Sequence, residues 1–265
     1  MDLPGIMVAP NGARKTKLDH PLMPINIEEV VSATIEARAA GATGLHAHVR
    51  DENQKHVLDA GLYRELLAEC ERNLPGLFIQ ITTEAVGIYT AREQAALVHE
   101  IEPEAISVCL KEMAGEGGLP AGADKKLARD FYHWTKEAEI DVQHILFDVG
   151  EFEQLKRCID AGIIPRSNLQ LLFVLGRYTK NMESSVSHVM PFVNELNSDF
   201  FNELETDWAI CAFGQMETDC LLKAVELGGK TRIGFENNIH NRDGSVAASN
   251  AERVKELIHA IDTNL

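Results

Sequence analysis

Two histidines separated by a single residue, His46 and His48, stand at the end of an apolar segment of strand length. Alternate side chains of an extended segment point to the same face, so both imidazoles are expected on one side of the chain. Neutral imidazoles are among the commonest protein ligands for zinc and other divalent metals. A carboxylate from elsewhere in the fold would complete a metal site. Without one, an ordinary hydrogen-bonded or surface pair explains the two residues as well.

Apolar segments of strand length alternate with helix-like segments such as 27–40 and 124–139, which is the pattern of a parallel sheet covered by helices. The predicted strands span 5–9, 44–49, 77–82, 105–109, 141–147, 169–175, 207–213 and 231–235. Glycines that follow several helix-like segments, as at Gly41 and Gly162, are typical of helix C-terminal caps. Eight strand-helix units of about 30 residues predict an α/β fold, the (β/α)8 TIM barrel.

The rival architecture is an open doubly wound sheet, which carries a Gly-rich phosphate-binding turn after its first strand. Residues 9–12 of this chain read Ala-Pro-Asn-Gly instead, so we expect the barrel. No Pro-, Gly- or Ser-rich linker divides the sequence. We therefore expect one TIM-barrel domain over residues 1–265.

Composition narrows the classes of function. The chain of 265 residues is 45% hydrophobic and carries a formal net charge of -16, which argues against binding to nucleic acid or to an anionic membrane surface. No apolar run is long enough to span a bilayer, so a soluble protein is expected. Five scattered cysteines without CxxC spacing argue against a disulfide framework and fit a reducing cytoplasm.

The active site of a TIM barrel lies at the carboxyl ends of its strands, and the predicted strands end in polar residues. These are Thr82, Thr83 and Glu84 after the third strand, Asp148 after the fifth, Arg177 after the sixth, Gln215 and Glu217 after the seventh, and Glu236, Asn237 and Asn238 after the eighth. Barrel closure places the first strand between the eighth and the second, so Glu236 can approach His46 and His48. Two His and one Glu would form a metal face with open positions for substrate.

Several motifs together resemble those of the beta-keto acid cleavage enzyme family, and the resemblance runs nearly end to end. It is carried by residues 46–51 (His-Ala-His-Val-Arg-Asp), 79–83 (Ile-Gln-Ile-Thr-Thr), 173–176 (Phe-Val-Leu-Gly), 232–238 (Arg-Ile-Gly-Phe-Glu-Asn-Asn) and 249–251 (Ser-Asn-Ala). The resemblance implies a zinc-bearing TIM barrel, usually a homotetramer, that exchanges acyl groups between a beta-keto acid and acetyl-CoA. The products would be acetoacetate and a new CoA thioester.

The resemblance also implies roles for individual residues. It implies His46, His48 and Glu236 as ligands of zinc or another divalent metal. That metal would act as a Lewis acid and stabilise the enolate of the keto acid. The resemblance implies Arg232 as a catalytic residue that holds anionic oxygens by charge-assisted hydrogen bonds.

The carboxylates of the family's acid/base relay are missing at two positions. Asn237 stands where the family has Asp, and Ile145 stands where an ungapped alignment puts a Glu. Neither side chain accepts a proton as a carboxylate does. Asp148 and His144 are alternative groups, although strand alternation puts His144 on the face opposite Ile145. We take Asn237 and Asp148 as catalytic candidates, and Glu84 as a further candidate that binds substrate.

The resemblance also points to substrate-binding residues. Thr82 and Ser107 fall where the family has Ser and Thr, so both positions keep a hydroxyl donor. Arg14 stands where the aminohexanoate-cleaving members have a Glu that receives an ammonium group, and a guanidinium favours an anion instead. The hypothesis is a substrate with a second negative group, such as a beta-keto dicarboxylate. Alternatively, Arg14 forms a solvated basic loop with Lys15 and Lys17, or meets the phosphates of CoA.

Three interpretations of function are open. The favoured one is a metal-dependent C-acyltransferase that acts on a beta-keto acid and acetyl-CoA. The second is an aldolase or hydrolase that uses the metal-stabilised enolate without CoA. The third is a catalytically inert, metal-bearing barrel that binds a keto acid as a sensor or scaffold. CoA-dependent turnover would separate the first from the second, and inert metal-bound protein would favour the third.

Overall fold

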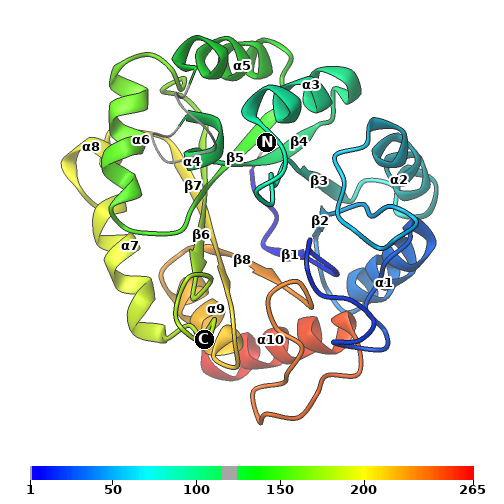
Figure 1. The fold of residues 1–265 in the computed structure, drawn as a ribbon. Coiled ribbons are helices and arrows are strands. Elements are labelled where there is room, and N and C mark those ends of the chain that lie inside the picture. Colours follow the sequence, from blue (N-terminus) through cyan, green and yellow to red (C-terminus); the bar gives the residue numbers. More distant parts are fainter. Residues whose placement is uncertain (1, 115–123) are drawn as a thin grey trace.

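Eight parallel strands form a closed barrel in the computed structural model, which describes residues 2–114 and 124–265 (Figure 1). The strands are β1 (Ile6–Val8), β2 (Gly44–Ala47), β3 (Phe78–Thr82), β4 (Ala105–Cys109), β5 (Asp141–Leu146), β6 (Leu169–Leu175), β7 (Thr206–Ala212) and β8 (Lys230–Ile233). Each strand pairs with its neighbours in the chain, and β8 closes the ring by pairing with β1. The predicted TIM barrel is confirmed, and the open doubly wound sheet is excluded.

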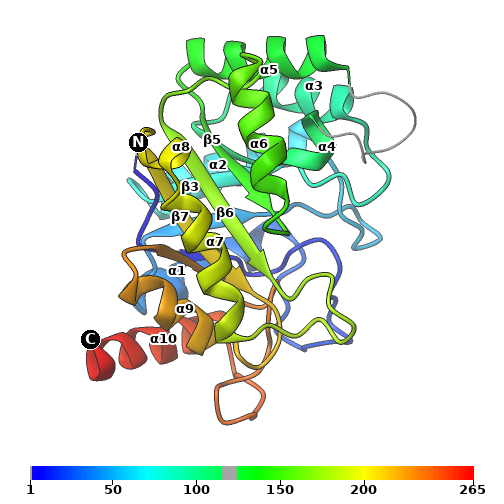
Figure 2. The ribbon, with the colours of Figure 1, turned by 90° about the vertical axis from the view of Figure 1, so that its left-hand side faces the viewer.

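The helices form an outer layer around the barrel, as Figures 1 and 2 show from two sides. They are α1 (Ile27–Ala39), α2 (Ala60–Asn73), α3 (Ala91–Ile101), α4 (Leu110–Ala114), α5 (Lys125–Glu137), α6 (Glu151–Asp160), the 3-10 turn η1 (Val186–His188), α7 (Val189–Leu196), α8 (Asp199–Asn202), α9 (Glu217–Glu226) and α10 (Asn250–Asn264). Side-chain caps fix the first residues of several helices. Asn26 and Glu29 form a reciprocal capping box on α1, and Thr90 and Glu93 form one on α3.

Two strands beside the predicted site are shorter than the sequence indicated. β2 ends at Ala47 and β8 ends at Ile233, whereas the predicted strands ran to 49 and 235. The chain leaves the sheet there for local reasons. Arg50 forms an isolated antiparallel bridge with His56, and Gly234 adopts a φ of +144°. The residues that follow these two strands are therefore positioned by loops.

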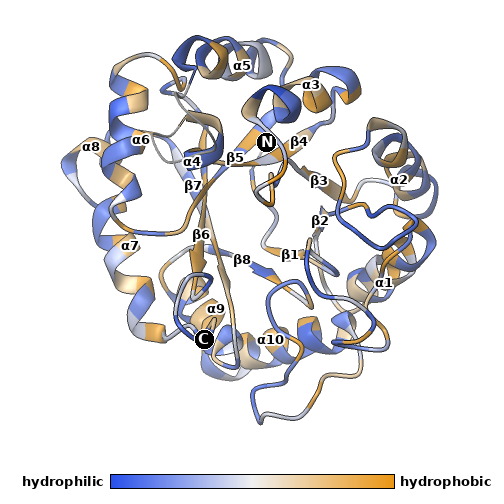
Figure 3. Ribbon diagram, viewed as in Figure 1, coloured by the Kyte–Doolittle hydropathy of each residue, from blue (hydrophilic) through white to orange (hydrophobic). Residues whose placement is uncertain are grey.

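The main apolar core fills the layer between the strands and the helices. Phe173 on β6 stacks on Phe192 of α7 with ring centroids 4.8 Å apart, and Phe152 of α6 packs against both rings. Figure 3 shows the strands mostly in the orange of apolar residues, while β8 stands out in blue. Three of the four residues of β8 are polar, and Arg232 is one of them.

The interior of the barrel holds both apolar and polar side chains. Strands β5 to β7 contribute an apolar cluster that includes Ile145, Leu172, Val174, Cys211 and Phe213. The Gln80 side chain of β3 hydrogen bonds to the Gln143 side chain of β5. Because β3 and β5 are not neighbours, these two side chains meet inside the barrel. The interior is therefore not uniformly apolar.

The five cysteines are all buried and free, in agreement with the prediction that no disulfide framework exists. No helix in the described ranges is long and apolar enough to cross a membrane.

Candidate metal and substrate site

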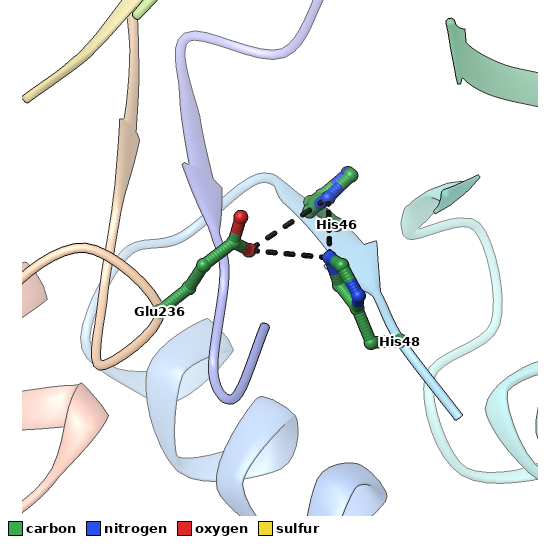
Figure 4. A group of neighbouring side chains, drawn as sticks. All are labelled: His46, His48 and Glu236. Carbon is green, nitrogen blue, oxygen red and sulfur yellow. Dashed lines mark hydrogen bonds and ion pairs between the residues drawn. The ribbon is translucent and has the colours of Figure 1, made fainter. Parts of the chain in front are cut away.

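His46, His48 and Glu236 converge at the carboxyl end of the barrel (Figure 4). His46 lies on β2, His48 lies one residue beyond that strand, and Glu236 follows β8. The two Nε2 atoms are 3.2 Å apart, and Glu236 Oε2 is 3.7 Å from His46 Nε2 and 3.6 Å from His48 Nε2. The expected approach of these three residues is therefore observed, although their role as metal ligands stays a prediction.

The backbone after β8 turns sharply so that Glu236 reaches the histidines. A Cβ at Gly234 would lie 2.4 Å from the carbonyl oxygen of Ala9, so only glycine fits there. The Glu236 amide donates to the same Ala9 oxygen at 3.1 Å. The Phe235 amide donates to Asn250 Oδ1 at 2.9 Å. Contacts from β1 and α10 thus hold the segment that carries the carboxylate.

An amide chain inside the barrel sets the tautomer of His46. Gln80 Nε2 donates to Gln143 Oε1 at 3.1 Å, and Gln143 Nε2 donates to the Leu171 carbonyl oxygen at 3.4 Å. The Oε1 atom of Gln80 lies 2.8 Å from His46 Nδ1 and can only accept, so His46 carries its proton on Nδ1. The Nε2 lone pair of His46 is therefore directed at Glu236.

His56 sets the tautomer of His48 in the same way. The Nε2 atom of His56 lies 3.0 Å from the Glu84 carbonyl oxygen and must donate to it. Its Nδ1, 3.4 Å from His48 Nδ1, then accepts the proton of His48. The sequence analysis did not single out His56, which is buried in the structure. The His48 Nε2 lone pair consequently also faces Glu236.

Burial keeps both imidazoles neutral. It lowers the pKa of His46 to about 4 and lowers the pKa of His48 well below its usual range. Burial alone would raise the pKa of Glu236, but Arg232 and His46 outweigh it, and the pKa of this carboxyl is lowered. At neutral pH the group therefore offers two neutral nitrogens and one carboxylate.

This donor set fits a divalent metal. Glu236 Oε2 is buried and has no hydrogen-bond partner within the described residues. Two imidazole lone pairs that face each other at 3.2 Å repel unless a positive charge lies between them. Ligand atoms around a tetrahedral zinc lie about 3.3 Å apart, given metal-nitrogen distances of about 2.0–2.1 Å. The three observed separations are close to that value.

Arg232 lies against the other oxygen of the same carboxylate. Its Nη2 is 3.3 Å from Glu236 Oε1 and 3.5 Å from Cys211 Sγ. Its Nε and Nη1 are buried and have no partner within the described part of the chain, and the same holds for Ser107 Oγ and for both amide atoms of Asn237. Buried polar atoms without partners are rare in native structures. These donors and acceptors are suited to contact a polar ligand at the barrel end.

A cavity of about 290 Å³ lies beside this group. Arg14, Lys15, Glu84, Arg177 and Glu236 are among the residues that line it. Two predicted substrate-binding residues, Arg14 and Glu84, are therefore in place to meet a ligand. Burial and the nearby Glu236 raise the pKa of Glu84, and Arg14 and Arg177 offset part of that rise.

Three other predicted residues have hydrogen bonds or ring contacts of their own. Asp148 is exposed, and its Oδ1 accepts a hydrogen bond from the Gly150 amide. Its carboxylate therefore stabilises the turn between β5 and α6. His144 lies on the outer face of β5 against the ring of Tyr132, with centroids 5.1 Å apart. Thr82 is buried, and its hydroxyl accepts from the Glu84 amide at 3.0 Å. The geometry gives no support for a catalytic role of Asp148.

The chain is similar to several known proteins. A 3-keto-5-aminohexanoate cleavage enzyme of Fusobacterium nucleatum is 24% identical over 93% of this chain and 87% of its own length. A 3-oxoadipate:acetyl-CoA acetyltransferase of Cupriavidus necator is 25% identical over 95% of this chain and 86% of its own length. The apo structure of ObcA superimposes with a TM-score of 0.70 at 14% identity. That match covers 90% of this chain and 61% of ObcA, and it shows the fold alone.

The sequence pattern that defines the beta-keto acid cleavage enzymes matches residues 5–264, which is nearly the whole chain. The motifs identified in the sequence, the closed barrel and the His-His-Glu group at its carboxyl end agree with that match. The chain belongs to the beta-keto acid cleavage enzyme family.

Proposed function

We propose that this protein exchanges acyl groups between a beta-keto acid and acetyl-CoA, with His46, His48 and Glu236 holding a divalent metal. The observation that carries the proposal is the convergence of two Nε2 lone pairs and a buried carboxylate oxygen beside Arg232, in a chain of this family. The names of two relatives support it, since one is a 3-oxoadipate:acetyl-CoA acetyltransferase and another a 3,5-dioxohexanoate:acetyl-CoA acetone transferase.

The reaction conserves every atom of its substrates. The keto acid loses a proton from C2, and C2 attacks the carbonyl carbon of acetyl-CoA and releases the CoA thiolate. The thiolate then attacks the C3 ketone, the bond between C2 and C3 breaks, and C2 regains a proton. The products are acetoacetate and the thioester of the remaining acyl group.

The side chains would divide this work. A metal bound by His46, His48 and Glu236 would supply Lewis acidity toward the oxygens of the keto acid. Arg232 would hold an anionic oxygen through Nε and Nη1, the two atoms that lack partners in the described structure. Ser107 and Asn237 would donate neutral hydrogen bonds to the same ligand, because their polar atoms are also unpaired.

A second cavity offers a place for the CoA portion. It measures about 550 Å³ and shares Ala13 and Arg14 with the smaller cavity. Lys17, Lys55 and the exposed side chain of Ile88 also line it. A nucleotide with phosphate groups needs this combination of cations and apolar surface, so we place the CoA moiety there.

Finer features of the proposal come from the family resemblance. We propose zinc as the metal and a homotetramer as the assembly. Five free, buried cysteines support a reducing, cytoplasmic location.

The test is acetoacetate release from a panel of short beta-keto acids, mono- and dicarboxylic, with and without acetyl-CoA, by metal-replete protein. His46→Ala is the test variant, and His259→Ala, which removes an exposed histidine of α10, is the matched control. Turnover that needs acetyl-CoA and His46 but not His259 is the expected result.

Two other results would overturn the proposal. Consumption of keto acid without acetyl-CoA would favour an aldolase or hydrolase. This alternative is open because Asn237 and Ile145 stand where the family has carboxylates. If folded, metal-bound protein released no acetoacetate from any acid of the panel, the proposed acyl exchange would be contradicted.

A further inference from the structure

The loop of residues 11–15 follows β1 and contacts two of the three residues proposed as metal ligands. Asn11 Nδ2 donates to the His48 carbonyl oxygen at 3.2 Å. At the other end of the loop, Lys15 Nζ donates to the Glu236 carbonyl oxygen at 2.6 Å. Because β1 lies between β8 and β2, the loop bridges the two strands that precede these ligands. Its position therefore affects how far apart the ligands lie.

The backbone of the same loop packs directly against the side chain of Glu236. Gly12 has a φ of +61°, a conformation that favours glycine. A Cβ at Gly12 would lie 2.4 Å from Glu236 Cγ and 3.0 Å from Glu236 Cβ. With contact this close, the loop and the carboxylate side chain cannot move independently of each other.

The main chain of this loop is held by a side chain from elsewhere. Within the described ranges, residues 10–15 form no hydrogen bond from main chain to main chain. Arg50 takes up their carbonyl oxygens instead. Its Nη2 lies 3.3 Å from the oxygen of Asn11, 2.6 Å from that of Gly12 and 2.8 Å from that of Lys15. Three carbonyl groups of the loop thus turn toward one guanidinium nitrogen.

The guanidinium of Arg50 is itself held in place. Arg50 is 6% exposed, its Nη1 donates to the Gln54 carbonyl oxygen at 2.9 Å, and its main chain bridges to His56. No carboxylate in the described part of the chain lies within ion-pair distance of it, and nearby carboxylates attract it only from longer range. Burying a charge that is paired only with carbonyl oxygens is costly. The arrangement is explained if the loop must be held in one position.

We propose that Arg50 is a positioning residue for the metal ligands and acts on them through the loop of residues 11–15. The loop carries the position of Arg50 to His48 and to Glu236, so these ligands are arranged before a metal binds. Ligands arranged in advance bind more tightly, because less order has to be created on binding. The inference rests on the proposed function in one respect, namely that these residues hold a metal.

The charge of Arg50 is a second way in which this residue could act on a metal, and it predicts the opposite sign. Burial is the main cause of the low pKa of His48, and the positive charge of Arg50 adds to it. The same charge repels a divalent cation, so its removal would tighten metal binding if charge dominated. If positioning dominates, removal weakens metal binding. The direction of the change therefore distinguishes the two effects.

Zinc affinity, measured by competition with a chromophoric chelator, is the first test. We expect Arg50→Gln to weaken zinc binding by at least about tenfold. Arg50→Lys keeps the charge but lacks the planar fork of donors, so it should restore only part of the loss. Arg129→Gln is the matched control, because the exposed Arg129 of α5 also donates to a main-chain oxygen, that of Ala161. Unchanged or tighter zinc binding in folded Arg50→Gln would overturn the inference.

Lys15→Met gives a second test that leaves the Arg50 guanidinium in place. It removes the hydrogen bond from the loop to Glu236, and it also removes a positive charge. We nevertheless expect weaker zinc binding. In the double variant with Arg50→Gln, the loss should be smaller than the product of the two single losses, because both changes act through one loop. Losses that multiply in full would mean two independent effects and would overturn the inference.

Hydrogen exchange of the metal-free protein gives a readout that does not depend on any ion. Amides of residues 11–15 should exchange faster in Arg50→Gln than in wild type, and should be unchanged in Arg129→Gln. Unaltered exchange in this loop would show that Arg50 does not hold it, and the inference would fail.

The same measurements separate this inference from the proposed function. Zinc binding that depends on Arg50, in a protein without acyl exchange, would support the inference and contradict the proposed function. Acyl exchange by wild type, with a zinc affinity that does not depend on Arg50, would overturn the inference alone. A wild-type protein that binds neither zinc nor another divalent metal would contradict both.

Discussion

Replacing Gln80 by Leu tests whether the hydrogen bonds of Gln80 inside the barrel orient His46 for the proposed metal. Gln80 Oε1 accepts the proton of His46 Nδ1 at 2.8 Å, and Gln80 Nε2 donates to Gln143 Oε1 at 3.1 Å. Gln80→Leu removes both hydrogen bonds at nearly constant volume. Removing an outer partner of a metal-binding histidine usually lowers metal affinity by about 10–100-fold. That range corresponds to about 1.4–2.7 kcal/mol of binding free energy.

Competition with a chromophoric chelator would give the metal affinity of each variant. Gln80→Glu keeps an acceptor for His46 and should restore the affinity lost in Gln80→Leu. Gln94→Leu is the matched control, because Gln94 is equally buried but accepts from Thr83 on the outer layer. Equal metal affinity in wild type and Gln80→Leu would refute the reasoning. A loss shared by the Gln94 variant would show a general packing effect instead.

Three further outcomes are expected. Burial lowers the pKa of His144 to about 4, so the free energy of unfolding should fall as pH drops from about 6.5 toward 4. His144→Phe should remove about 2 kcal/mol of that loss at pH 5, measured by urea unfolding. Gly234→Ala should cost about 1–3 kcal/mol and weaken metal binding, because its Cβ would press on the Ala9 oxygen. Zinc at about 100 times its Kd should stabilise wild type by about 2.7 kcal/mol and should stabilise Glu236→Gln much less, measured by thermal unfolding.

Each of these predictions has a contradicting result. An unchanged pH dependence in His144→Phe would mean that His144 is not held neutral by burial. Unaltered stability of Gly234→Ala would show that the turn after β8 relaxes easily. Equal stabilisation of the Glu236→Gln variant by zinc would place the metal elsewhere.

Much of the site followed from the order of strands. The alternation of strands and helices predicted the barrel, and barrel closure placed Glu236 opposite His46, because β1 lies between β8 and β2. Asp148 shows the limit of that reasoning. It does follow β5, but it is exposed, and its carboxylate accepts a hydrogen bond from the Gly150 amide. Position after a strand does not determine which way a loop side chain points.

The partners of the histidines could be predicted only in part. Gln80 is a polar residue within the apolar segment Ile79 to Ile81, and this signals an interior hydrogen bond. Its contact with Gln143 depends on the diameter and register of the closed barrel. His56 gave no such signal, because its place depends on the bridge to Arg50 in a loop. Loop geometry also decides that Lys15 and Arg177 both contact the ring of Phe213.

The distance along the sequence between the two histidines and Glu236 has a consequence for folding. His46 and His48 come from the first quarter of the chain, and Glu236 comes from its last part, on either side of the three-residue strand β1. These three residues can meet only after β8 has paired with β1 and closed the ring. Metal binding would then occur late in folding and would stabilise the pairing of β1 with β8. No fragment that lacks β8 should retain the ion. Metal retention could therefore report directly on whether the barrel has closed.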